Sequence, residues 1–191
     1  MPLTASVRVR VLRFRAWVAL AAGRTDAALA VFDRLLAVMP GDRHALASRA
    51  DLRERMGDRQ LAIEAMNELV AAYPGDAAGW FNLGYLLEAS GMLSRAGEAF
   101  LRACELAPDL DQAWFGLAQV RIREGRLDEA KAALENNTRL QPLSPHGWYQ
   151  LARLHAECRS DDEAIRIIRH LYGFEPRVAA RLERETGLVA R

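Results

Sequence analysis

A repeat with one fixed period constrains this chain more than any other feature of its sequence. Prolines keep this period at Pro40, Pro74, Pro108, Pro142 and Pro176. Alanines keep it at Ala28, Ala62, Ala96, Ala130 and Ala164, and glycines at Gly23, Gly57, Gly91 and Gly125, with Arg159 in the fifth place. A row of small residues reads Ala16, Ala50, Gly84, Ala118 and Ala152, and a row of large apolar residues reads Phe32, Met66, Phe100, Leu134 and Ile168. These rows share one register and predict a single structural unit stacked on copies of itself.

Each unit is predicted to be a pair of helices. In the third unit, apolar residues recur at spacings of three and four, at Trp80, Leu83, Gly84 and Leu87 and again at Ala96, Phe100 and Ala103. Each set predicts one helix with one buried stripe. Gly91 ends the first helix, and Pro108 closes the unit because proline cannot continue a helix. Asp42, Asp76 and Ser144 are suitable N-caps for the helices that follow, with Pro145 at a first helical position. We therefore expect helices throughout and no strands.

These residues resemble the tetratricopeptide repeat, whose pattern is W-x2-L-G-x2-Y, then A-x3-F, an alanine and a proline, within a unit of about 34 residues. The third unit matches the pattern best, with Leu87 in place of the tyrosine. The fourth and fifth units keep Trp114 with Leu117 and Trp148 with Leu151. The first two units depart from it, with Leu12 and Leu46 in the tryptophan row and Arg15 and Arg49 in the leucine row. The resemblance implies an all-α fold, a right-handed superhelical solenoid of helix-turn-helix repeats.

The repeat also predicts the organisation of the chain. Five repeats are expected at 9–42, 43–76, 77–110, 111–144 and 145–178, after an N-terminal lead at 1–8. The remaining residues, 179–191, are expected to form a C-terminal capping helix and tail. Val178 and Leu182 lie one helical turn apart, and Arg181 is spaced to pair with Glu185. Such a helix would cover the apolar end of the fifth repeat, or it would dock another subunit.

The resemblance implies that the first helices of the repeats line a concave groove, which the family generally uses to hold peptides or protein segments. The candidate groove residues are Arg13, Trp17, Asp51, Phe81, Tyr85, Glu88, Phe115, Gln119, Tyr149 and Arg153. Phe81, Phe115 and Tyr149 form an aromatic row that suits recognition of an extended or helical peptide. The alternative is that these rings pack between adjacent first helices. Lys131 is the single lysine, so a lysine-based clamp for chaperone tails is not expected.

The first 25 residues are basic and contain no acid. Five arginines give them a charge of +5, whereas the whole chain carries +1, so the remainder carries −4. Three interpretations stay open. The segment is a secretory signal, a footprint for an acidic partner or nucleic acid, or a solvated helix face that complements acids such as Asp51 and Glu54.

The sequence contains no pattern that indicates catalysis. It has no phosphate-binding loop, nucleophile elbow, paired-acid motif or metal-ligand spacing, so no cofactor and no metal are expected. Cys104 and Cys158 are interpreted as packing residues, and His44 and His146 as polar lining of the groove. An apolar content of 51% with 27% charged residues indicates an ordinary globular protein. No apolar run is long enough to span a bilayer.

The sequence therefore predicts a non-enzymatic adaptor that binds a protein or peptide segment, acting as a scaffold, assembly factor or chaperone. One alternative is an accessory subunit that recruits substrate for an enzyme or stabilises it. A weaker one is a nucleic-acid contact through the basic N-terminus. Assembly of the chain into homo-oligomers is a further open alternative. Unpaired cysteines favour the cytoplasm over the periplasm or secretion, and the excess of arginine over lysine suggests a bacterial source.

Overall fold

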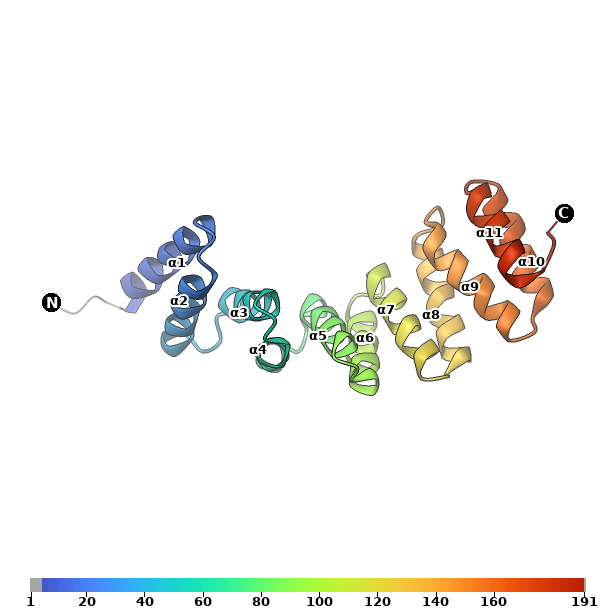
Figure 1. Cartoon of the computed structure of the whole chain (residues 1–191). Helices are drawn as coiled ribbons and strands as arrows, with labels where there is room; N and C mark the ends of the chain where they lie inside the picture. Colours follow the sequence, from blue (N-terminus) through green and yellow to red (C-terminus); the bar gives the residue numbers. More distant parts are fainter. Residues whose placement is uncertain (1–4, 191) are drawn as a thin grey trace. The chain divides into compact units, whose positions relative to one another are not determined.

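The computed structural model describes residues 5–190, and it contains α-helices and no strand over that range (Figure 1). The helices are α1 (Ala5–Ala21), α2 (Thr25–Val38), α3 (Arg43–Arg55), α4 (Arg59–Ala72), α5 (Ala77–Ala89), α6 (Leu93–Leu106), α7 (Asp111–Arg123), α8 (Leu127–Leu140), α9 (Pro145–Glu157), α10 (Asp161–Tyr172) and α11 (Pro176–Thr186). The prediction of an all-helical chain is confirmed.

The helices form two compact units, Met1–Gly91 and Met92–Arg191. In the first unit, α1 packs against α2 and α3 against α4, while α2 also packs against α3 and α4 against α5. In the second unit, successive helices from α6 to α10 pack against one another, and α11 packs against both α10 and α9. Each helix therefore finds its apolar partner close by in the sequence, as in a repeat architecture.

The repeated rows form the core of both units. The alanine row from Ala28 to Ala164 is completely buried, and the large apolar row from Phe32 to Ile168 is at most 5% exposed. The small-residue row is buried as well, from Ala16 through Gly84 to Ala152. Small residues at these places let two helix backbones approach closely, and the large side chains fill the space beside them.

The glycine row marks turns with a left-handed backbone. Gly57 has φ of +85° and Gly125 has φ of +73°, a region that glycine enters without steric cost. The fifth member of the row, Arg159, adopts the same conformation with φ of +60° and is the one non-glycine residue with positive φ between residues 5 and 190. The turn is therefore kept even where the favoured residue is absent.

Two of the three predicted N-cap residues form capping hydrogen bonds with their side chains. The Asp42 carboxylate accepts a hydrogen bond from the Ala45 amide, and the Asp76 carboxylate accepts one from the Gly79 amide. Ser144 lies at the N-cap of α9, but its side chain makes no capping hydrogen bond. Pro145 begins α9 as predicted. A proline has no amide hydrogen to satisfy at that place.

The tryptophan row differs from the prediction of a fully buried stripe. Trp80, Trp114 and Trp148 are half-buried near the start of their helices. Each indole Nε1–H donates to the carbonyl of the proline six residues earlier, at 3.0 Å for Trp80 and 2.9 Å for the other two. An indole needs such an acceptor when it leaves water, so the tryptophan and proline rows work together.

The two ends of the chain also differ in detail from the prediction. Helix α1 begins at Ala5, inside the expected lead, and residues 1–4 lie outside the described residues. Helix α11 begins at Pro176, inside the expected fifth repeat. Its buried residues are Ala179 and Leu182. The division of the chain into five units of equal length stays a prediction.

Candidate functional site

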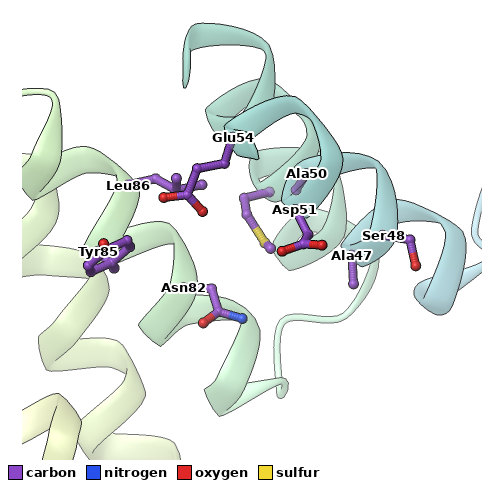
Figure 2. A pocket seen from close by; sticks show the side chains of 9 residues that line it. Ala47, Ser48, Ala50, Asp51, Glu54, Asn82, Tyr85 and Leu86 are labelled. Atoms are coloured by element: carbon purple, nitrogen blue, oxygen red, sulfur yellow. The ribbon is translucent and has the colours of Figure 1, made fainter. Parts of the chain in front are cut away.

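A pocket opens between the first helices α3 and α5 in the first unit. It has a volume of about 360 Å³ and is lined by Ala47, Ser48, Ala50, Asp51 and Glu54 from α3, Met66 from α4, and Asn82, Tyr85 and Leu86 from α5. Figure 2 shows that the carboxylates of Asp51 and Glu54, the Asn82 amide and the Tyr85 ring surround one space. The helices bring these groups together because α3 and α5 each expose a face that the core rows leave unburied.

The pocket combines an exposed aromatic ring with negative charge. Tyr85 is 53% exposed. Asp51 forms an exposed ion pair with Arg55 at 3.1 Å, one turn along α3. No such pair is present for the Glu54 carboxylate within the described residues. The pocket therefore offers an aromatic surface, two carboxylates and an amide to a ligand that carries donors or positive charge.

The structure places the other predicted residues of this unit apart from the pocket. The Arg13 guanidinium pairs with the Asp42 carboxylate at 2.6 Å, so the acid that α1 complements is Asp42 and neither Asp51 nor Glu54. Trp17 is 65% exposed on α1 and stacks against Phe14, with 6.1 Å between ring centroids. Phe81 is half-buried on α5, and neither it nor Glu88 lines the pocket.

In the second unit, two predicted aromatic residues share a smaller pocket. Phe115 from α7 and Tyr149 from α9 line a volume of about 270 Å³ together with Val178 and Arg181 from α11. Both rings are half-buried, and so is Gln119 one turn after Phe115. Helix α11 therefore forms part of the surface that these rings line.

Tyr149 is held by the C-terminal helix. Its hydroxyl donates to the Glu185 carboxylate at 2.5 Å, and the guanidinium groups of Arg153 and Arg181 lie 5.9 and 5.2 Å from the centre of its ring. The hydrogen bond to Glu185 raises the pKa of Tyr149, because it stabilises the protonated phenol. The same bond, with a second from Arg181, lowers the pKa of Glu185. A further pocket of about 490 Å³ opens beside this cluster, between α9 and α11.

Sequence reasoning did not include Asn82, Val178, Arg181 or Glu185 among the site residues. The spacing of Arg181 and Glu185 did predict their ion pair, which forms at 2.6 Å. Nothing in that spacing shows that the pair also reaches Tyr149 on another helix. A contact between separate helices depends on how they pack, which the pattern of one helix does not record.

Burial shifts the pKa values of two groups of the kind that take part in covalent chemistry, the Cys104 thiol and the His155 imidazole. Burial raises the pKa of the Cys104 thiol to about 12, so the nucleophilic thiolate is disfavoured. Burial, followed by the charge of Lys131, lowers the pKa of His155. Between residues 5 and 190, no cluster of three or more histidine, cysteine or acidic residues could hold a metal ion. In the same range, no helix has the length and apolar character needed to cross a bilayer.

Comparisons with known proteins agree with this architecture. The model of the tetratricopeptide repeat family matches residues 47–111 and 112–176. The chain is similar to the crystal structure of MamA, with 18% identity over 94% of both chains and a TM-score of 0.78. It is also similar to YrrB, described as a repeat protein with an unusual peptide-binding site, with 19% identity over 88% of both chains and a TM-score of 0.75.

A third similar structure is a thermophilic repeat protein of Thermus thermophilus. It is 24% identical over 97% of this chain and all of its own, with a TM-score of 0.56. At such identities, the three structures support the fold alone. No curated protein sequence matches the chain significantly.

Proposed function

Because this chain belongs to the tetratricopeptide repeat family, we propose that it is a non-enzymatic scaffold that binds a segment of a partner protein on its first helices. In this role it acts as an assembly factor or chaperone. The observation that carries the proposal is the pocket between α3 and α5. Its exposed tyrosine, two carboxylates and amide are groups that recognise a peptide.

The pocket favours a segment with a basic or donor-rich side chain. The Tyr85 ring contributes contact area at small entropic cost, since only two side-chain torsions need to be fixed. Asp51 and Glu54 attract a positive group, and Asn82 can either donate to or accept from a peptide backbone. The expected ligand is an extended or helical peptide with an arginine or lysine side chain placed in the pocket.

An array of synthetic peptides tests this proposal with the full-length protein. The array varies charge and aromatic content systematically, and the peptides that bind best are then measured in solution by fluorescence anisotropy. We expect basic peptides to be enriched, and Tyr85→Ala to weaken their binding by about tenfold or more, the loss expected for a central aromatic anchor. Glu54→Gln should weaken it too, and added salt should reduce the effect of that charge.

A matched control is Leu61→Ala. Leu61 is a large apolar residue on α4 that is 42% exposed and does not line the pocket. Helix content by circular dichroism should be unchanged in all three variants, because the altered side chains are outside the buried rows. If Tyr85→Ala binds the selected peptides as well as the unaltered protein does, or if no peptide is enriched, the proposal is wrong.

A further inference from the structure

The outer face of α1 is unlike the matching face of every later first helix. Two rows on the first helices follow the period of the repeat. One contains Ala45, Gly79, Ala113 and Gly147, and the other contains Leu52, Leu86, Val120 and Leu154. All eight residues are buried. The members of these rows on α1 are Val11 and Val18, and each is 43% exposed.

The buried rows lie against the helix that precedes them. A Cβ atom added to Gly79 would lie 2.5 Å from Leu69 on α4, and a Cβ atom added to Gly147 would clash with Asn137 on α8. Gly116 on α7 packs in the same way against the ring of Phe100 on α6. Phe14 on α1 stands in the same register as Gly116, three repeats earlier, and is 64% exposed. Asn82 on α5 shares this register and is exposed beside the pocket. Among the described residues, no helix precedes α1 to cover this face.

Four of the exposed apolar residues of α1 form one seam, and Trp17, which stacks on Phe14, lies beside it. Val7, Val11, Phe14 and Val18 are separated by four, three and four residues, the spacing by which one helix packs along another in a coiled coil. All four side chains are exposed. We call these four residues the α1 seam. The other side of α1, with Ala16 and Ala19, is buried.

Positive charge flanks the α1 seam. Arg8 and Arg15 stand one residue after Val7 and Phe14, which is the flanking position on one side, and Arg10 takes the flanking position on the other. These three side chains are exposed and form no ion pair within residues 5–190. No acid precedes Asp26 in the sequence. Charges at flanking positions select the partner of a helical seam, and arginines select acidic residues.

We propose that the α1 seam is a docking site for an acidic amphipathic helix of a partner protein, which lies along α1 where later first helices meet a preceding helix. A second copy of this chain fits less well. Its own α1 would bring like charge, and its α11 exposes Arg177 and Arg184.

Two designed peptides test the docking site with the full-length protein. Both are helical over about three heptads with leucine at the seam positions, and they differ only in carrying glutamate or lysine at the flanking positions. Fluorescence anisotropy should show the glutamate peptide binding at least about tenfold more tightly than the lysine peptide. The difference should shrink as salt is raised.

Charge reversal provides the decisive variant. Arg10→Glu combined with Arg15→Glu should invert the preference, so that the lysine peptide binds more tightly, because both arginines are exposed and the seam itself is unchanged. Phe14→Ser should abolish binding of both peptides, whereas Leu101→Ser, an exposed apolar residue on α6, should have no effect. Tyr85→Ala should also have no effect, which separates this site from the pocket between α3 and α5.

Three results would overturn the proposal. The first is equal binding of the two peptides, or a preference that the double charge reversal leaves unchanged. The second is a dimer of the unaltered protein that Phe14→Ser converts to a monomer in sedimentation analysis, because a second copy would then cover the seam. The third is binding to vesicles containing phosphatidylserine, lost in Phe14→Ser, with no binding of either peptide.

Discussion

Replacing Arg159 with glycine should stabilise the protein, although it removes a side chain. Arg159 adopts φ of +60° at the turn between α9 and α10, where the other four members of the row are glycine. The left-handed conformation costs a residue with a Cβ about 1–2 kcal/mol. Glycine avoids that cost but loses about 0.5–1 kcal/mol more backbone entropy on folding. The balance predicts a gain of about 0.5–1 kcal/mol for Arg159→Gly.

Thermal and urea unfolding, followed by circular dichroism, measure this gain. A stabilisation of that size should raise the melting temperature by about 1–4 °C in a chain of this length. The urea midpoint should rise while the slope of the transition is unchanged, since the surface exposed on unfolding is the same. The side chain of Arg159 is exposed and forms no ion pair between residues 5 and 190, so little packing is lost with it.

Gly125→Ala is the matched control in the same unit. Gly125 has φ of +73°, and a Cβ atom added there would meet no heavy atom within 4 Å. Its substitution should therefore destabilise the protein through the backbone conformation alone, by about 1 kcal/mol. If Arg159→Gly lowers the urea midpoint while Gly125→Ala lowers it too, the Arg159 side chain stabilises the turn by more than its backbone costs, and the reasoning is refuted.

Two further substitutions test the caps and the tryptophan row. Asp42→Ala removes the capping bond to the Ala45 amide and the ion pair with Arg13, and should cost about 1–2 kcal/mol of unfolding free energy. Burial opposes ionisation of Asp42, but the bonds from Arg13 and Ala45 outweigh it and lower its pKa. The ionised Asp42 carboxylate should contribute fully to the free energy of unfolding above its unfolded-state pKa of about 4, and this contribution should be lost as the pH falls through the lower pKa of the folded state. The urea midpoints of the unaltered protein and of Asp42→Ala should therefore converge in acid. Trp114→Phe removes the bond to the Pro108 carbonyl and should lower the free energy of unfolding by about 0.5–1.5 kcal/mol, and an unchanged urea midpoint would show that this bond adds nothing to stability.

The fold could be predicted from the sequence because each repeated row carries one physical requirement. Ala96 must be small where helices approach closely, Gly91 must allow a left-handed turn, and Phe100 must fill the core. These requirements are local or act between neighbouring repeats, so they remain visible in the sequence. The half-buried state of Trp80 was not visible, because it depends on a hydrogen bond to the carbonyl of Pro74. Every residue has a backbone carbonyl, so the sequence does not show which carbonyl accepts the hydrogen bond of the indole.

The candidate site was less predictable, because the chain itself covers part of the expected surface. Tyr149 and Arg153 belong to a face of α9 that α11 approaches, and the hydroxyl of Tyr149 is bonded to Glu185. A ligand that needs Tyr149 must replace that bond and the two guanidinium contacts on its ring. Tyr85 on α5 is 53% exposed and lies beside the pocket of the first unit. Freeing Tyr149 for a ligand therefore costs free energy that Tyr85 does not require. This difference favours the pocket of the first unit as the place where a partner binds first.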